Sequence, residues 1–346
     1  MRRGALVLLW GVLLGALLTE IVDRMGLKYI QGIIWPTDLY TFQHMPAPPL
    51  DVAVFGSSRA SFALSPDAID TCLSEELGRP THSVNLARTF STAFTARAIV
   101  RDLLHGAHKP KVLLLGVGPE FFNENNHQMA PSVATHADIT DLPTTLRHAR
   151  GLTGMVSALW PLVRGAESMS IFLSGRHETQ DHLRWMMLHH GGGQFCYGTT
   201  TCTENNTRLR ANLAHRWGTA VSTMLPTIGE ERFSDYVTGS GMVHDSMLDL
   251  LAWSRAEGVQ LGIVRLPLHD RFLSRIPPEA TQKNEAYLRW LSQEEGIPVF
   301  STDGPEWTKK KGYYIDPDHV GPRASERLSH HVCRRMLTDM LSEGAD

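Results

Sequence analysis

The chain has 346 residues, of which 42% are hydrophobic and 20% are charged, and this composition excludes a disordered protein because it supplies enough apolar side chains for a sizeable core. The formal net charge of −3 excludes a strongly basic surface of the kind that neutralises phosphate groups, so we expect no nucleic-acid partner. The length allows one large α/β domain that carries an insertion.

The N-terminus has the features of an export signal. Arg2 and Arg3 precede an apolar run over residues 4–18, which is typical of a signal sequence or signal anchor whose positive end stays in the cytoplasm. As a helix this run spans about 22 Å, less than the roughly 30 Å of a bilayer core, so a cleaved signal peptide and a secreted protein are an alternative. Because the small-residue cleavage pattern is poor, we expect an anchor at residues 1–35 that continues as an amphipathic helix along the membrane. The folded part would then lie in the periplasm or at the cell surface. An alternative for the amphipathic helix is that it packs into the globular domain.

A Pro-rich linker over residues 36–50 leads into alternating strands and helices. Short apolar runs predict strands at residues 51–55, 82–87, 112–115, 261–266 and 298–301. Helical patterns with capping residues predict helices at residues 65–77, 91–105, 246–257, 279–295 and 322–341. This alternation predicts a three-layer α/β/α sandwich with a mainly parallel sheet over residues 51–122 and 243–342.

Residues 123–242 interrupt the alternation with polar segments and short helical stretches, and we interpret them as a mainly helical insertion. In its Gly/Thr-rich loop, Cys196 and Cys202 lie close enough along the chain to form a small disulfide in an oxidising compartment. Cys72 and Cys333 each fall in a predicted helix. The adjacent histidines 189 and 190 precede three glycines, and such loop histidines are more often solvated than ligating, so we expect no metal site.

The first chemical motif is Gly56-Ser57-Ser58-Arg59, which follows the first predicted strand. Ligands of open α/β sheets bind at the carboxyl ends of the strands, so Ser58 is expected at the functional edge. A serine hydroxyl is a weak nucleophile until a base removes its proton. Because Gly and Ser are also ordinary residues of a strand-to-helix turn, the motif indicates catalysis only together with a base.

The second motif places Asp316 and His319 three residues apart, just before the last predicted helix. At this spacing a carboxylate can hold the imidazole in one tautomer while the other ring nitrogen faces a serine, as in a serine triad. An alternative is that Asp316 and Asp318 only cap the turn into the helix, but this leaves the histidine unexplained. With Ser58, the motif predicts acyl transfer through an acyl-serine, which needs no cofactor or metal.

The order of these motifs resembles the SGNH (GDSL-like) hydrolase superfamily, in which Gly-x-Ser follows the first strand and Asp-x-x-His precedes the last helix. The resemblance implies that Ser58 is the nucleophile, that His319 is the general base and acid, and that Asp316 orients the imidazole. Ser57 stands where the superfamily motif has Asp, which is typical of its membrane-associated, cell-envelope branch. The resemblance therefore implies an esterase or O-acyltransferase that acts on acylated glycans or lipids of the envelope. A membrane acyltransferase would be a further partner.

The oxyanion hole departs from this superfamily, which takes donors from the serine N–H, a glycine after the second strand and an asparagine after the third. Gly118 stands in the place of that asparagine, and we consider Asn85 or Arg88, at the end of the second strand, as a substitute. Loss of one oxyanion donor typically costs about 2.7–4 kcal/mol. A catalytically inactive envelope protein that binds a glycan or a partner acyltransferase is therefore the alternative function.

Arg59 of the first motif and two further charged residues are candidates for substrate contacts at the same edge. Glu120 follows the third predicted strand and either contacts the substrate or pairs with Arg59. Arg265 ends the fourth predicted strand, where a guanidinium can bind a carboxylate or a sugar, although a structural ion pair is the simpler interpretation.

Overall fold

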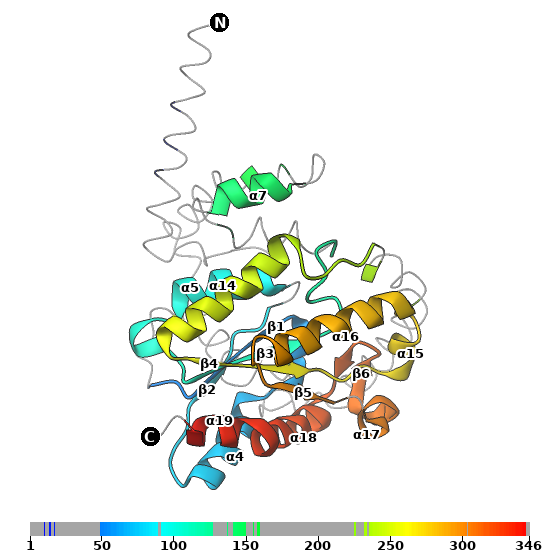
Figure 1. The fold of residues 1–346 in the computed structure, drawn as a ribbon. Helices are drawn as coiled ribbons and strands as arrows, with labels where there is room; N and C mark the ends of the chain where they lie inside the picture. Colours follow the sequence, from blue (N-terminus) through cyan, green and yellow to red (C-terminus); the bar gives the residue numbers. More distant parts are fainter. Residues whose placement is uncertain are drawn as a thin grey trace, which may run out of the picture. The chain divides into compact units, whose positions relative to one another are not determined.

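The computed structural model describes residues 49–88, 91–126, 141–149, 235–302 and 304–343, together with positions 10, 14, 17, 137, 155, 158, 159, 225, 232 and 233. The chain divides into two compact units, one formed by residues 1–46 and 130–185 and the other by residues 47–129 and 186–346. The second unit holds the sheet and most of the described residues (Figure 1).

Five parallel strands form the central sheet in the order β2-β1-β3-β4-β5. They are β1 (Val52–Gly56), β2 (Ser83–Asn85), β3 (Val112–Val117), β4 (Gln260–Arg265) and β5 (Val299–Ser301). All residues of β1, β2 and β3 are buried, as expected for strands with both faces covered. From β1 the chain passes to β2 on one side of it and then crosses to β3 on the other side. In sheets of this kind, ligands bind at the carboxyl ends of the two strands where the direction reverses, here β1 and β3.

Helices cover both faces of this sheet (Figure 1). One face carries α5 (Ala93–Leu103), α14 (Gly241–Glu257) and α16 (Pro278–Gln293). The other carries α3 (Ser58–Ala63), α4 (Pro66–Leu77), α18 (Pro322–Val332), a π-helical turn (Cys333–Leu337) and α19 (Thr338–Glu343). Short helices are η2 (Gly106–His108), α15 (Asp270–Leu273), α17 (Pro305–Thr308) and η6 (Lys311–Tyr313), and the smaller unit contributes α7 (Leu142–His148). The predicted α/β architecture is thus confirmed.

The bounds of α4 show why the sequence pattern succeeds. The Ser65 hydroxyl accepts the backbone N–H of Ala68 as the N-cap, and Pro66 occupies the first helical position. Gly78 ends the helix with φ +64°, in the left-handed conformation that glycine adopts without steric cost. These signals lie next to each other in the sequence, so the helix can be predicted without tertiary information.

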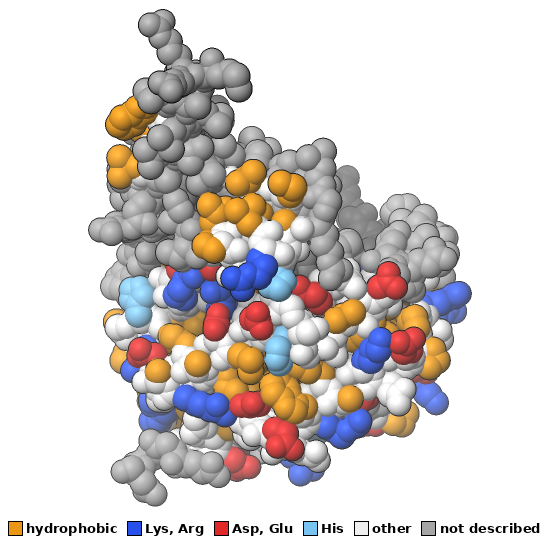
Figure 2. Space-filling view, turned by 45° about the horizontal axis from the view of Figure 1, so that its top comes forward, with side chains coloured by type: hydrophobic (Ala, Val, Ile, Leu, Met, Phe, Trp, Pro, Cys, Tyr) orange, Lys and Arg blue, Asp and Glu red, His pale blue; other side chains and the backbone are white. Residues whose placement is uncertain are grey.

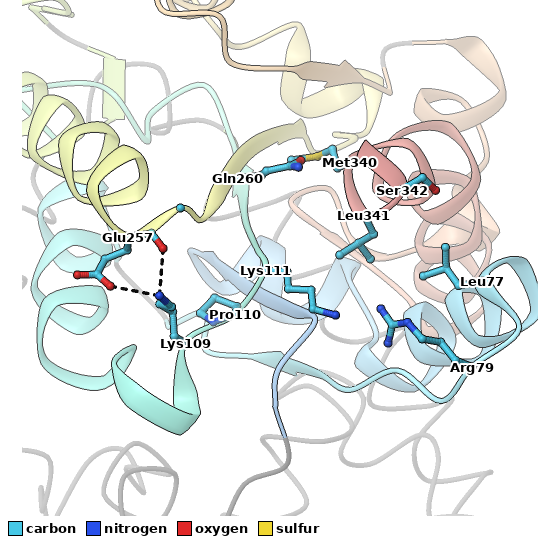
Figure 3. A pocket seen from close by; sticks show the side chains of 11 residues that line it. Leu77, Arg79, Lys109, Pro110, Lys111, Glu257, Gln260, Met340, Leu341 and Ser342 are labelled. Atoms are coloured by element: carbon cyan, nitrogen blue, oxygen red, sulfur yellow. Dashed lines mark hydrogen bonds and ion pairs between the residues drawn. The ribbon is translucent and has the colours of Figure 1, made fainter. Parts of the chain in front are cut away.

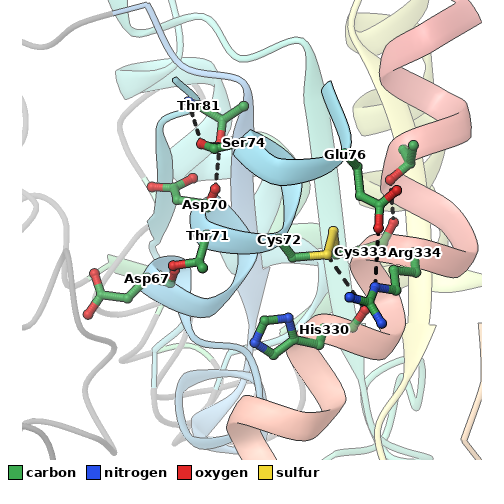
Figure 4. The surroundings of a disulfide bond; sticks show 11 residues. Asp67, Asp70, Thr71, Cys72, Ser74, Glu76, Thr81, His330, Cys333 and Arg334 are labelled. Atoms are coloured by element: carbon green, nitrogen blue, oxygen red, sulfur yellow. Dashed lines mark hydrogen bonds and ion pairs between the residues drawn. A yellow bond between two sulfur atoms is a disulfide. The ribbon is translucent and has the colours of Figure 1, made fainter. Parts of the chain in front are cut away.

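A disulfide joins Cys72 of α4 to Cys333 at the end of α18, and both cysteines are fully buried (Figure 4). An ion pair of 3.2 Å joins Glu76 of α4 to Arg334 of the π-helical turn. Each cysteine was predicted to lie in a helix, but their pairing could not be predicted, because it depends on packing between segments 261 residues apart. Cys196 and Cys202, for which a disulfide was predicted, lie outside the described residues.

The N-terminal anchor stays a prediction. Residues 1–35 lie outside the described part of the chain except for Trp10, Leu14 and Leu17, which are helical and exposed. Within the residues that the structure describes, no helix has the length and apolar character needed to cross a bilayer.

Candidate active site

Ser58 lies at the carboxyl end of β1 because the chain turns there directly from strand to helix. Gly56, the last strand residue, has φ +150°, and a Cβ at this position would lie 2.2 Å from the carbonyl oxygen of Gly116. Only glycine fits this close approach of β1 to β3. Ser57 follows as the N-cap of α3, and Ser58 is the first residue of that helix.

Asp316 and His319 reach the same edge on a small antiparallel hairpin formed by β6 (Tyr314–Asp316) and β7 (His319–Val320). His319 Nε2 lies 2.8 Å from Ser58 Oγ. His319 Nδ1 lies 2.9 Å from Asp316 Oδ1 and 3.1 Å from Oδ2. The imidazole protonated at Nδ1 donates to Asp316 and accepts the Ser58 hydroxyl, which is the arrangement of a serine triad. The structure therefore brings the three predicted residues together.

Asp316 also shapes the turn that presents the histidine. Its Oδ1 accepts the backbone N–H groups of Asp318 at 2.9 Å and of His319 at 2.8 Å. The capping role and the triad role, considered as alternatives from the sequence, thus belong to one carboxylate. The imidazole itself is held on a further side by the ring of Phe62 on α3, with ring centroids 5.0 Å apart.

A group of four charged side chains lies directly beside the triad. Arg59 Nε donates to Asp318 Oδ1, and Arg59 Nη1 pairs with Glu120 Oε1. Arg232 Nη1 lies 2.9 Å from Asp318 Oδ2 and 3.2 Å from Glu120 Oε1. We call these four residues the buried ion cluster, because Arg59, Asp318 and Glu120 are at least 94% shielded from solvent at their side chains. Two guanidinium groups balance two carboxylates.

Electrostatics favour the charged forms of Asp318 and Arg59. Burial disfavours the charged form of Asp318, but the charges of Arg59 and Arg232 outweigh it and hold the pKa of this carboxyl well below its usual range. Burial likewise disfavours the charge of Arg59, yet Asp318 and Glu120 raise the pKa of its guanidinium above the usual value.

The ion pair between Arg59 and Glu120 confirms one of the two roles predicted for Glu120. Sequence reasoning missed Asp318 and Arg232 as members of the site. Asp318 carried a local signal, since it is the second acidic residue of the Asp-x-x-His motif and directly precedes the histidine. Arg232 carried none, because only the fold brings it to residues 120 and 318.

Gly118 makes room for Arg59. A Cβ at position 118 would lie 2.1 Å from Arg59 Nη1, so the guanidinium fills the space into which a side chain at 118 would project. An asparagine there would have to displace Arg59 from the buried ion cluster. The departure from the superfamily pattern at Gly118 and the position of Arg59 are therefore two parts of one arrangement.

Asn85 is engaged elsewhere, and its proposed role as an oxyanion donor is wrong. Its side-chain amide donates to the carbonyls of Ala60 at 3.1 Å and Leu64 at 2.7 Å, and its Oδ1 accepts the Ala87 N–H at 3.0 Å. Both amide hydrogens are thus used to satisfy carbonyl groups at the end of α3. Asn85 positions the helix that carries Ser58 rather than the substrate.

Arg88 and Arg265 differ in how they relate to the site. The Arg88 backbone N–H donates to Gly56 O at 2.9 Å, which extends the pairing of β2 with β1 up to the turn before Ser58, while its side chain donates to Ala87 O at 2.7 Å. Arg265 forms an ion pair with Glu285, as the simpler interpretation predicted. This pair borders a pocket of about 170 Å³ that also includes Gly118 and several leucines of the β4–α15 segment.

A larger pocket, of about 530 Å³, lies at the amino ends of β3 and β4 and so at the edge opposite Ser58 (Figure 3). Its cations are engaged within the protein. Lys109 pairs with Glu257, whereas Arg79 and Lys111 both pair with Asp51. On the face shown in Figure 2, positive and negative side chains of the described residues are interspersed rather than gathered in separate fields. Within the described residues, no group of three His, Cys, Asp or Glu side chains is placed to hold a metal.

Comparison with protein-family models gives no match, and comparison with curated protein sequences gives none either. The functional assignment therefore depends on the geometry of the site.

Proposed function

We propose that the chain is a serine-dependent acyl-ester hydrolase or O-acyltransferase that works through an acyl-Ser58 intermediate. The observation that carries this proposal is the continuous hydrogen-bond chain from Ser58 Oγ through the His319 imidazole to Asp316, with distances of 2.8 and 2.9 Å. Each residue has the neighbour that its role in acyl transfer requires.

In the first half of the reaction, His319 Nε2 takes the hydroxyl proton as Ser58 Oγ attacks the ester carbonyl. Collapse of the tetrahedral intermediate breaks the bond to the alcohol, which leaves with the proton that His319 returns. In the second half, water or a sugar hydroxyl gives its proton to His319 and attacks the acyl-serine, which releases the acid or the new ester. Asp316 keeps Nδ1 protonated and stabilises the imidazolium in both halves.

The developing oxyanion needs donors close to Ser58. Ser58 opens α3, so its backbone N–H has no carbonyl partner within that helix and serves as one donor. Gly118 stands where the superfamily has its asparagine donor. The guanidinium of Arg59 fills the space of that side chain, but we assign it no role as an oxyanion donor. We therefore expect slower turnover of simple esters than a site with a complete oxyanion hole would give.

The topology supports the assignment to the SGNH superfamily. A strand order of 2-1-3-4-5 is that of flavodoxin-like doubly wound sheets, in which the ligand lies at the ends of β1 and β3. Ser58 follows β1, and Glu120 follows β3. The proposed nucleophile thus lies where this fold class binds ligands.

The proposed substrate is an acylated glycan or lipid of the cell envelope. The buried disulfide between Cys72 and Cys333 supports an oxidising, extracytoplasmic compartment, because disulfides are rare in the reducing cytosol. A membrane anchor at residues 1–35 would raise the local concentration of envelope substrates around the enzyme. A membrane acyltransferase that supplies the acyl group would be the matching partner.

The absence of an asparagine at Gly118 favours a second candidate function, namely a catalytically inactive envelope protein that binds a glycan or a partner acyltransferase. Such a protein would keep the fold without turning over esters.

One experiment separates the two functions. We would incubate the full-length protein with p-nitrophenyl acetate, follow nitrophenol release, and identify the modified residue by mass spectrometry. The proposal predicts an acetyl adduct on Ser58 and loss of both signals in Ser58→Ala. The matched control is Ser57→Ala, which removes a neighbouring hydroxyl that caps α3 and should cost about 1 kcal/mol of stability without removing the adduct. Background rates in all three proteins, with no adduct, would favour the inactive binding protein.

A further inference from the structure

We infer that Arg59 and Asp318 act as a positioning pair that holds His319 in line with Ser58. The inference depends on the proposed function, because it assigns a role within the same acyl-transfer site. Neither residue belongs to the triad.

The pair links the same two segments that the triad links. Arg59 directly follows Ser58 on α3, and Asp318 directly precedes His319 on the hairpin of β6 and β7. The ion pair of Arg59 with Asp318 therefore lies beside the hydrogen bond of Ser58 with His319, and each contact spans about 260 residues of sequence. Two adjacent links fix the distance and the orientation of one segment relative to the other, whereas a single hydrogen bond leaves rotation free.

Burial indicates that stability alone does not explain the pair. The side chains of Arg59 and Asp318 are 4% and 3% exposed, so both charges lose nearly all their hydration. Buried ion pairs often contribute no more stability than apolar side chains of similar size would, because desolvation offsets their attraction. The charged pair instead fixes the orientation of the Asp318 side chain, since one carboxylate oxygen accepts from Arg59 and the other accepts from Arg232.

The Arg59 guanidinium is itself held from several sides. Glu120 binds Nη1 from the end of β3, and the Phe272 ring of α15 lies 5.0 Å from the guanidinium carbon. The backbone at Gly118 passes so close that no side chain fits between them. Arg59 is therefore a fixed reference point from which Asp318, and with it the turn to His319, is placed. Placement of a catalytic group to within about 1 Å can be worth 100-fold in rate.

The test is the double variant Arg59→Met/Asp318→Leu in the full-length protein. It removes one positive and one negative charge, so Glu120 and Arg232, which lie 3.2 Å apart, still neutralise each other. The cavity is refilled by apolar side chains, so we expect a folded protein by circular dichroism and a melting temperature near that of the wild type. We expect the rate of Ser58 labelling by a fluorophosphonate probe to fall about 100-fold. With p-nitrophenyl acetate the loss should appear in kcat, with KM nearly unchanged.

Two single variants complete the design. Arg59→Lys keeps the charge but not the planar fork, so it should label Ser58 faster than the double variant and about tenfold more slowly than the wild type. Arg79→Met is the matched control, because it removes an arginine that pairs with the buried Asp51 far from the triad. It should leave the labelling rate unchanged.

The outcomes distinguish this inference from the proposed function. If the wild type is labelled at Ser58 and both Arg59 variants are labelled as fast as the wild type, the positioning role is wrong while the proposed catalytic serine stands. If the wild type does not label, both conclusions fall. Should the double variant fail to fold, the rate of Arg59→Lys decides alone, and a rate equal to that of the wild type would overturn the inference.

Discussion

At the residue scale, the Asp316 carboxylate has two roles. It holds the imidazole through Nδ1, and it also accepts two backbone N–H groups of the turn. Removing the side chain would remove both contacts, whereas a neutral isostere separates them. The two roles can therefore be tested apart.

Asp316→Asn should strongly reduce the proposed esterase activity while keeping the turn. The amide oxygen can still accept the backbone N–H groups, but the amide nitrogen would face His319 Nδ1 and favour the tautomer whose Nε2 cannot accept the Ser58 proton. The corresponding replacement in serine proteases lowers kcat by about 10⁴-fold. We expect a loss of that order in p-nitrophenyl acetate turnover, with a melting temperature close to that of the wild type. Asp316→Ala should lose stability as well, and an active asparagine variant would argue against the triad.

Asp318 makes stability depend on pH. Its folded pKa lies below the unfolded value of about 3.9, so its charge contributes stability that is complete above that value and is lost as the pH falls through the folded pKa. Asp318→Asn should cost about 3–5 kcal/mol at pH 6, because Arg59 loses a buried partner. By pH 3 the gap between variant and wild type should shrink by about 1 kcal/mol. Urea unfolding of both proteins at the two pH values checks this, and a constant gap would contradict it.

At the scale of elements, the C-terminal helix α18 is fixed to the helical layer that carries Ser58. α18 packs against both α3 and α4, and its end is covalently joined to α4 through Cys333 and Cys72. The predicted single helix over residues 322–341 is interrupted by a π-helical turn that begins at Cys333. π-Helical turns are rare, and each adds one residue to a turn of the helix. Here the turn begins at Cys333, the residue that forms the disulfide.

Removing this disulfide should lower stability without removing the triad. Cys72→Ala/Cys333→Ala should reduce the free energy of unfolding by about 2–4 kcal/mol, chiefly because the unfolded chain regains freedom over a long loop. Urea unfolding under non-reducing conditions measures the difference, and adding a reductant to the wild type should bring the two curves together. Ser58 labelling should persist in the folded variant. Reaction of a thiol reagent with Cys72 in the denatured, non-reduced wild type would show that the bond is absent.

The strands and long helices could be predicted from the sequence because their signals are local. β1, β3 and β4 were placed to within two residues from short apolar runs, and Ser65 and Gly78 marked the ends of α4. The hairpin of β6 and β7 was missed, since strands of three and two residues leave no periodicity to detect. The contacts of Arg232 and the pairing of Cys72 with Cys333 were missed for a different reason, because these partners meet only through tertiary packing.

At the scale of the whole molecule, the doubly wound sheet places chemistry from distant parts of the chain on one edge. Ser58 and Arg59 follow β1, Glu120 follows β3, and the hairpin adds Asp316 and His319. The opposite edge carries a larger pocket, but its cations are paired within the protein. The size of a pocket is therefore a poorer guide to the proposed function than the hydrogen bond between Ser58 and His319.

The separation of 261 residues between Ser58 and His319 also determines when the proposed activity can begin during synthesis. Chains are synthesised from the N-terminus at about 5–20 residues per second, so the nucleophile would emerge roughly 10–50 seconds before its base. During that interval Ser58 has no partner to take its proton. An exported chain would thus pass its own membrane as an inert polypeptide and acquire the power to cleave or transfer acyl groups only once its C-terminal segment has arrived and packed against α3.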